Sequence, residues 1–115
     1  MQSNTYGKRS EIIASNYLQE KGYKILETNY KNKIGEIDVI AQDGEYIVFV
    51  EVKARLSSAF GHPFEAINLK KQQKIHKVAS LYLVQKRKYG KLCRFDAISI
   101  LGLEKPEISH IIDAF

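Results

Sequence analysis

The sequence contains few of the residues that cross-link a chain or interrupt its regular structure. Its 115 residues include one cysteine, Cys93, and two prolines. A single cysteine excludes an intrachain disulfide and a zinc site built from several thiolates, and it fits a reducing compartment. The longest apolar runs fall well short of the roughly 20 residues that a membrane-spanning helix needs. The polar N-terminus, MQSNTYGKRS, lacks the apolar segment of a secretory signal, so we expect a cytoplasmic protein outside the membrane.

Acidic residues are outnumbered by basic ones. The chain carries 18 Lys and Arg residues against 13 Asp and Glu residues, which gives a formal net charge of +5. This balance favours an anionic partner such as nucleic acid, although many basic proteins bind none. The 44% hydrophobic content suffices for one packed core, and no Pro/Gly-rich or low-complexity linker divides the chain. We therefore expect a single domain over residues 1–115.

Hydrophobic periodicity and turn residues predict two helices and five strands. The predicted elements are a helix at 7–21, a strand at 23–30, two strands within 35–55, a helix at 64–88, and strands at 94–101 and 108–112. Gly22 suits the C-terminal cap of the first helix, Gly90 follows the second, and Asn68 is a point where the second could be interrupted. The order α-β-β-β-α-β-β predicts an α/β fold with a mixed β-sheet flanked by helices.

The segment GEIDVIAQDGEYIVFVEVKAR, residues 35–55, predicts a β-hairpin. A two-residue turn centred on Asp43–Gly44 would pair Asp38 with Phe49 and Glu36 with Glu51. Alternation along the strands then defines two faces of the sheet. One face carries Glu36, Asp38, Phe49, Glu51 and Lys53, and the other carries Ile37, Val39, Val48, Val50 and Val52. In this register Asp38 and Glu51 are diagonal neighbours, with Cα atoms about 7–8 Å apart.

Asp38, Glu51 and Lys53 are ionisable residues on strands that otherwise have buried character, where an unpaired charge is costly. Two carboxylates on one face can share a divalent cation, and Mg²⁺ prefers such oxygen ligands together with water and substrate phosphate. A bound metal ion can activate a water molecule and neutralise charge at phosphorus, while the ammonium of Lys53 could stabilise the transition state or position the water. The pattern therefore indicates phosphodiester hydrolysis.

An ordinary structural interpretation competes with this one. Glu51 and Lys53 could instead form a solvent-exposed ion pair on an edge strand. The segment IVFVEV is apolar in both strand registers, however, which favours a central strand. Facing Glu36 and Glu51 side chains would also repel each other unless a cation lay between them. These two features favour the metal site.

GEID joined to FVEVKAR at this spacing resembles the PD-(D/E)xK nuclease superfamily, which has the restriction-endonuclease-like fold. More narrowly, the chain resembles the YraN-like family of small endonuclease-like proteins, akin to archaeal Holliday-junction resolvases. The resemblance extends over GYKILETNY (22–30), GEIDVIA (35–41), VFVEVKAR (48–55), FGHPFEAI (60–67) and RFDAISI (94–100). It implies that Asp38 and Glu51 bind metal together with the main-chain carbonyl of Val52, and that Lys53 is the catalytic lysine.

Glu11 is a further acid that the resemblance implies, because an acid in the first helix of resolvase-like proteins reaches toward the metal site. In this sequence Glu11 falls in line with Ala14 and Leu18, at the edge of the apolar face of the helix. The alternative is therefore a solvated residue at the rim of the core. Ser10 departs from the glycine that similar proteins often carry before this acid.

Basic residues near the predicted site supply candidates for nucleic-acid binding. Arg55 follows the predicted catalytic strand and could contact a phosphate, or could simply be solvated at the strand end. Lys70, Lys71 and Lys74 lie on one side of the second helix and could follow a nucleic-acid backbone, although such a run can also be a solvated helix face. The neighbouring Gln72 and Gln73 are open alternatives for a helix residue that assists the site.

These observations lead to a predicted Mg²⁺- or Mn²⁺-dependent endonuclease that hydrolyses phosphodiester bonds in DNA, including branched or structured DNA. The alternative is a non-catalytic nucleic-acid-binding protein that retains the nuclease fold, and a third option is a protein-interaction domain. Because resolvase-like proteins act as dimers on two-fold symmetric junctions, the resemblance also implies a homodimer.

Overall fold

The structure is a computed structural model that describes residues 2–56, 67–88, 90–102 and 104–115. Its elements are α1 (Gln2–Glu20), β1 (Lys24–Lys31), β2 (Glu36–Asp43), β3 (Tyr46–Arg55), α2 (Leu69–Gln85), β4 (Leu92–Leu101) and β5 (Glu107–Ile111). This order confirms the predicted α-β-β-β-α-β-β arrangement. Residues 60–66 of the FGHPFEAI motif, where the second helix was predicted to begin, lie outside the described residues. Within the described chain, no helix combines the length and apolar character needed to cross a membrane.

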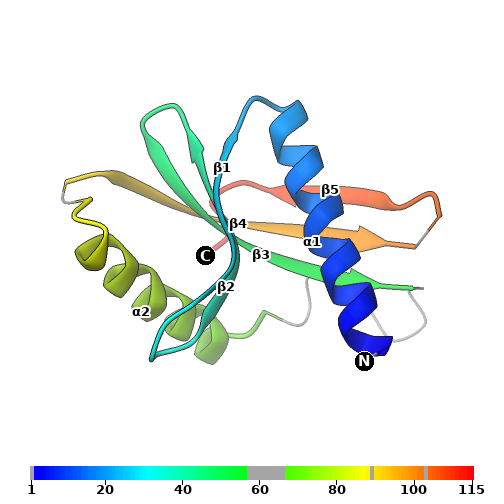
Figure 1. The fold of residues 1–115 in the computed structure, drawn as a ribbon, viewed down its shortest axis with the longest axis horizontal. Helices are drawn as coiled ribbons and strands as arrows, with labels where there is room; N and C mark the ends of the chain where they lie inside the picture. The colour runs from blue at the N-terminus through cyan, green and yellow to red at the C-terminus, as the bar shows by residue number, and fades with distance from the viewer. Residues whose placement is uncertain (1, 57–66, 89, 103) are drawn as a thin grey trace.

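The five strands form one mixed sheet in the order β1-β2-β3-β4-β5. β3 and β4 are parallel, whereas the other three neighbouring pairs are antiparallel. A parallel pair needs a crossover connection, and α2 lies in the connection between β3 and β4. β3 is therefore the middle strand of the sheet, with α1 and α2 on opposite sides (Figure 1). This position excludes the interpretation of Glu51 and Lys53 as an ion pair on an edge strand.

Apolar side chains cover both faces of the sheet, which explains why β3 is apolar in both registers. One core layer, against α1, contains Ala14, Leu18, Val39, Ala41, Val48, Val50, Ile98 and Ile100. The other, against α2, contains Ile40, Ile47, Phe49, Ile75, Val78, Ala79 and Tyr82. Each strand thus places alternate residues in different layers. Burying both faces fixes the parity of β2 and β3, since a slip by one residue would exchange the two layers.

The hairpin between β2 and β3 turns one residue later than predicted. Asp43 pairs with Tyr46, so the two-residue turn is Gly44–Glu45 and the predicted Asp43–Gly44 turn is wrong. Gly44 has a φ of +60°, which glycine adopts readily at the first central position of such a turn. Each β2 residue consequently pairs two positions further along β3, and Phe49 pairs with Ile40 instead of Asp38. Because this shift is even, it preserves the face on which each side chain lies.

Two further details of the hairpin differ from the prediction. Glu36 pairs with Lys31 of β1, not with Glu51, and lies 3.9 Å from its ammonium at the exposed edge. Ile37 packs in the α2 layer, whereas it was predicted to share a face with Val39. The pairing of β2 with β3 ends at Val39, so the residues before Val39 are not held in the alternation of β3. Val39, Val48, Val50 and Val52 do lie in the α1 layer as predicted.

The ends of both helices follow from local capping. Gly22, at a φ of +95°, donates its N–H to Gln19, and Tyr23 donates to Leu18, which confirms the predicted cap of α1. α1 begins earlier than predicted, at Gln2. α2 begins after Asn68 because the Asn68 side chain accepts a hydrogen bond of 2.9 Å from the Lys71 N–H. α2 ends at Gln85, before the predicted 88, and Arg87 has a positive φ of 54°.

Replacing Asn68 by Ala removes the cap that fixes the first turn of α2. We expect the free energy of unfolding to fall by about 1 kcal/mol, because an N–H of this turn loses its acceptor. Urea denaturation followed by circular dichroism measures the change. Asn68→Asp is the matched control, since aspartate also accepts at this position and its charge suits a helix N-terminus. Equal stability of Asn68→Ala and the unmodified protein would contradict this role.

Candidate active site

Asp38 and Glu51 meet where β2 leaves β3. The last pair between these strands is Val39 with Val50, and Asp38 and Glu51 are the next residues of the two strands beyond this pair. Asp38 Oδ2 accepts a hydrogen bond of 2.8 Å from the Val52 N–H, in place of a main-chain carbonyl of β2. The side chains of Asp38 and Glu51 also share a hydrogen bond. The two predicted acids are therefore direct neighbours instead of the diagonal neighbours of the predicted register.

The main chain of Val52 borders the same gap. In a β-strand the N–H and C=O of one residue point toward the same neighbouring strand. Because the Val52 N–H binds Asp38, its carbonyl also faces the side where β2 has left the sheet. Two carboxylates and one carbonyl form an oxygen donor set, which suits Mg²⁺ or Mn²⁺ with water and substrate completing the coordination. Within residues 2–56, 67–88, 90–102 and 104–115, no group of three or more Asp, Glu, His or Cys side chains is placed to hold a metal.

Two lysines converge on Glu51, whose side chain is nearly buried at 6% exposure. Lys53 follows it on the same face of β3, and its Nζ lies 3.3 Å from Glu51 Oε2. Lys71 reaches the same oxygen from the first turn of α2, at 2.5 Å. We call Asp38, Glu51, Lys53 and Lys71 the carboxylate–lysine cluster. It joins the strand residues predicted from the hairpin to a helix residue that was predicted only as a nucleic-acid contact.

The environment of the cluster shifts the pKa values of its two acids in opposite directions. Burial, followed by the charge of Glu51 and its hydrogen bond, raises the pKa of Asp38 to about 8. Burial also acts to raise the pKa of Glu51, but hydrogen bonds from Asp38 and Lys71 outweigh it and hold this pKa below its ordinary value. Asp38 therefore carries the proton at neutral pH, and Glu51 carries the negative charge.

The pKa values of the two lysines are shifted in opposite directions, as are those of the two acids. Burial and the neighbouring Lys71 lower the pKa of Lys53. Burial opposes the charge of Lys71 too, yet its hydrogen bonds to Glu51 and Lys53 raise its pKa overall. In the metal-free protein, Lys71 is therefore the ammonium that best neutralises Glu51. A lowered pKa makes the Lys53 ammonium a more ready proton donor than an ordinary lysine.

Glu11 lies half-buried on α1, within electrostatic range of the cluster. Burial and the charge of Glu36 raise the pKa of Glu11, and Glu11 in turn contributes to raising the pKa of Asp38. Its neighbours Ala14 and Leu18 are fully buried, as the helical pattern predicted. Glu11 is thus a half-buried residue at the rim of the core whose charge acts on Asp38, and its part at a metal site stays a prediction.

The remaining predicted residues lie around the cluster. Arg55 ends β3, where its Nη1 donates to the Ala54 carbonyl at 3.0 Å. Lys70 is exposed on α2, and the Gln72 side chain donates to the carbonyl of Ile67. Lys74 borders a cleft of about 460 Å³ between the β1–β2 connection and α2. The lining of this lysine cleft consists of Lys31, Asn32, Gly35, Glu36, Lys71, Lys74 and Ile75. Of the helix residues considered from the sequence, Lys71 is the one that contacts Glu51.

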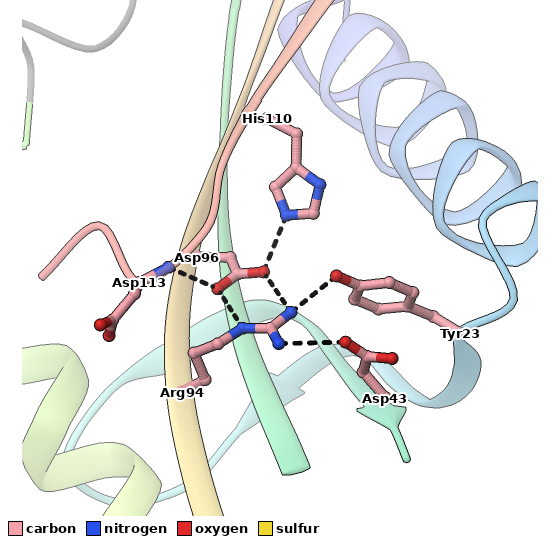
Figure 2. Close-up of polar contacts among 6 residues, drawn as sticks. All are labelled: Tyr23, Asp43, Arg94, Asp96, His110 and Asp113. Atoms are coloured by element: carbon pink, nitrogen blue, oxygen red, sulfur yellow. Dashed lines mark hydrogen bonds and ion pairs between the residues drawn. The ribbon is translucent and has the colours of Figure 1, made fainter.

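A second buried group of charges lies on the opposite face of the sheet, around Asp96, which the sequence placed in a strand with a capping or pairing role (Figure 2). Arg94 and Asp96 of β4 pair with Val48 and Val50, whose side chains lie in the α1 layer. Asp96 is fully buried, and both of its oxygens accept hydrogen bonds from Arg94 at 2.9 Å. The spacing of Arg94 and Asp96, two residues apart on one strand, was the available sequence signal.

Asp96 and Arg94 connect several elements of the fold (Figure 2). Asp96 also binds His110 Nε2 at 2.7 Å and accepts from the Asp113 N–H at 3.0 Å. Arg94 donates to the hydroxyl of Tyr23 at 2.6 Å and to Asp43 at 3.0 Å. The burial and full set of partners of Asp96 indicate a structural role. We call these six residues the Arg94–Asp96 network.

Comparison with known proteins identifies the family. The profile of "Uncharacterised protein family UPF0102" matches residues 10–100, a span that includes the whole carboxylate–lysine cluster. The chain is 47% identical to a UPF0102 protein of Clostridioides difficile over 115 residues, which is 100% of both chains. It is 50% identical to one of Caldanaerobacter subterraneus subsp. tengcongensis, over 96% of this chain and 94% of the relative. A UPF0102 protein of Alkaliphilus metalliredigens is 44% identical, over 98% of this chain and 99% of the relative. The chain therefore belongs to the UPF0102 family, which is the YraN-like family that its motifs resemble.

Proposed function

We propose that this protein is a Mg²⁺- or Mn²⁺-dependent endonuclease that hydrolyses phosphodiester bonds in DNA. The observation that carries the proposal is the junction of β2 and β3, where Asp38 and Glu51 share a hydrogen bond beside the Val52 main chain. Glu51 is buried and the adjacent Asp38 is half-buried, and holding one of the two acids protonated costs stability. Such arrangements of acids with shifted pKa values are typical of functional sites. A divalent cation is the partner that would allow both carboxylates to ionise.

Each residue of the cluster has a defined part in this proposal. Asp38, Glu51 and the Val52 carbonyl would hold the cation, which when bound supplies an acidified water and neutralises charge at phosphorus. Lys53, 3.3 Å from Glu51 and with a lowered pKa, would orient the attacking water and exchange a proton with it. Glu11 would be an auxiliary acid that acts on Asp38 through its charge.

The surroundings of the cluster support a nucleic-acid substrate. The net charge of +5 and the lysine cleft beside Glu51 favour a polyanion. Arg55 and Lys74 would contact backbone phosphates on either side of the scissile bond. Branched or structured DNA and a homodimeric assembly remain part of the proposal because the family motifs resemble those of resolvases. A cytoplasmic location remains part of it because a single cysteine fits a reducing compartment.

A cleavage assay with several DNA structures tests the proposal. Labelled single-stranded, duplex and four-way-junction DNA are incubated with the protein in Mn²⁺ and in EDTA. We expect cation-dependent cleavage of at least one substrate, and a loss of about 100-fold or more in Asp38→Ala and Lys53→Ala. Glu45→Gln, an exposed residue of the β2–β3 turn, is the control and should cleave normally. Equal cleavage by all four proteins would identify a contaminating nuclease and overturn the assignment.

One observation favours a second candidate, a nucleic-acid-binding protein without catalysis. Lys71 already neutralises Glu51 at 2.5 Å, so the cluster has an internal counter-charge. This candidate predicts DNA binding that weakens with salt and is unchanged in Asp38→Ala, without cleavage under any condition. Binding titrations at several salt concentrations, run beside the cleavage assay, separate the two functions.

A further inference from the structure

Lys71 belongs to two sites at once. Its ammonium lies 2.5 Å from Glu51 Oε2 in the carboxylate–lysine cluster, and its side chain also lines the lysine cleft. The side chain is 38% exposed, whereas that of Glu51 is 6% exposed. Lys71 is therefore a partly solvated cation at the boundary between a buried acid and an open cleft.

The contact between Lys71 and Glu51 conflicts with metal binding at the same acid. Glu51 Oε2 already forms ion pairs with Lys71 and Lys53, and Asp38 shares a further hydrogen bond with Glu51. A divalent cation held by Asp38 and Glu51 would be repelled by an ammonium at 2.5 Å from one of its ligands. Lys71 must leave this position, or remain at a cost to metal affinity.

The lysine cleft offers Lys71 a second position. Lys31, Lys74 and Lys71 line this cleft of about 460 Å³ together with one acid, Glu36. The Lys31 ammonium lies 3.9 Å from Glu36, and the Lys71 ammonium lies at Glu51. Gly35 lets the Lys74 side chain pack close to the main chain, since a Cβ at this position would lie 3.0 Å from Lys74 Cε. Three lysines around a cleft of this size suit a phosphate group of a nucleic-acid backbone.

We propose that Lys71 is a resident cation that occupies Glu51 in the metal-free protein and transfers to a substrate phosphate in the lysine cleft when a divalent cation takes Glu51. This inference rests on the proposed metal site. It assigns Lys71 a positioning role that couples metal binding to substrate binding. The bound metal ion displaces the Lys71 ammonium from Glu51, and the ammonium then contacts a substrate phosphate. By reciprocity, the charge of Lys71 weakens metal binding in the absence of substrate.

The first test measures metal affinity directly. Isothermal titration of EDTA-treated protein with Mn²⁺ and with Ca²⁺ should give about tenfold tighter binding for Lys71→Met than for the unmodified protein. Lys71→Arg retains the charge and should bind close to the unmodified protein. Lys74→Met, which alters the same cleft without touching Glu51, should leave the metal affinity unchanged. Lys71→Gln is a second neutral variant if Lys71→Met folds poorly by circular dichroism.

The second test measures DNA binding in two conditions that do not support cleavage of the bound strand, EDTA and Ca²⁺. Fluorescence anisotropy of a labelled oligonucleotide reports the affinity. We expect Lys71→Met to lose about tenfold more affinity in Ca²⁺ than in EDTA, because Lys71 reaches the cleft only after the cation binds. Lys74→Met should lose equally in both conditions, and Lys91→Gln, exposed before β4, should lose in neither.

The outcomes separate this inference from the proposed function. If the unmodified protein binds neither Mn²⁺ nor Ca²⁺, the metal site is wrong and the inference falls with it. If the protein binds these cations and Lys71→Met binds them no more tightly, the role of Lys71 is overturned while the metal site stands. Equal loss of DNA affinity by Lys71→Met in EDTA and Ca²⁺ likewise overturns the transfer.

Discussion

Asp38→Asn is expected to stabilise the metal-free protein and, at the same time, to abolish the divalent-cation binding that we propose for this site. At neutral pH the Asp38 side chain is protonated, donates to Glu51 and accepts from the Val52 N–H. An asparagine reproduces this arrangement, since its amide N–H₂ can donate to Glu51 and its oxygen can accept from Val52. The variant therefore keeps the hydrogen bonds of the resting cluster and removes the acid that must be kept neutral.

The stability gained by Asp38→Asn increases as the pH rises. The pKa of Asp38 is raised from 3.8 to about 8, so the folded protein retains a proton that the unfolded chain releases. The unmodified protein therefore loses stability as the pH rises from about 4 to about 8, whereas Asp38→Asn does not titrate at this position. Each pKa unit corresponds to about 1.4 kcal/mol, and the opposite shift of Glu51 offsets part of the total. We expect a net gain of about 1–3 kcal/mol at pH 9.

Thermal unfolding in EDTA and in Mn²⁺ measures both effects. In EDTA at pH 9 the variant should unfold at a higher temperature than the unmodified protein, and at pH 4 the two should be similar. Added Mn²⁺ should raise the midpoint of the unmodified protein alone and so reverse the order. Glu45→Gln controls for the loss of an acid without a buried partner. A midpoint of Asp38→Asn below that of the unmodified protein at pH 9 in EDTA would contradict the assigned protonation.

The part of the site that could be predicted from the sequence is the part controlled by strand alternation. Asp38, Glu51 and Lys53 were placed on one face by strand alternation counted from the predicted turn, and the observed shift of two residues leaves this alternation unchanged. The exact register was predicted wrongly by two residues because it depends on which residues form the turn. Gly44 takes the first central position, and neither the Asp-Gly dipeptide nor the hydrophobic pattern distinguishes this from the alternative.

The part that could not be predicted depends on contacts between elements. Lys71 was recognised as basic, but its contact with Glu51 depends on where α2 lies against the sheet. Asn68, which starts α2, gave the only local indication of that helix boundary. Arg94 and Asp96 were adjacent on one strand face, yet the partners His110 and Tyr23 come from β5 and from the residue before β1. Sequence spacing alone cannot bring such distant residues together.

Asp96→Ala is expected to cost about 3–5 kcal/mol of unfolding free energy, more than any other prediction for this chain. The loss is large because Asp96 is fully buried and holds the guanidinium of Arg94, whose side chain is 11% exposed. Removing the carboxylate leaves a charge with little access to water, and it also frees the hydrogen-bonding groups of His110 and Asp113. Urea denaturation measures the change. Asp43→Asn, at the exposed end of the network, should cost about 0–1 kcal/mol.

Protonation of Asp96 is expected to destabilise the protein in acid. This effect occurs at a lower pH than the effect of Asp38. Burial acts to raise the pKa of Asp96, but hydrogen bonds from His110, Arg94 and the Asp113 main chain lower it overall. A lowered carboxyl pKa contributes stability above the ordinary value near 4, which is lost as the pH falls through the folded-state pKa. Asp96→Asn should therefore lose less stability than the unmodified protein between pH 4 and pH 2.

A double variant distinguishes an unpaired charge from a simple loss of packing. Arg94→Met combined with Asp96→Leu removes both charges, so it should recover part of the stability that Asp96→Ala loses. Because Arg94 and Asp96 lie on the α1 face and the carboxylate–lysine cluster contacts α2, the folded double variant should bind Mn²⁺ as the unmodified protein does. A double variant no more stable than Asp96→Ala would show that the stability comes from packing of the network and not from pairing of its charges.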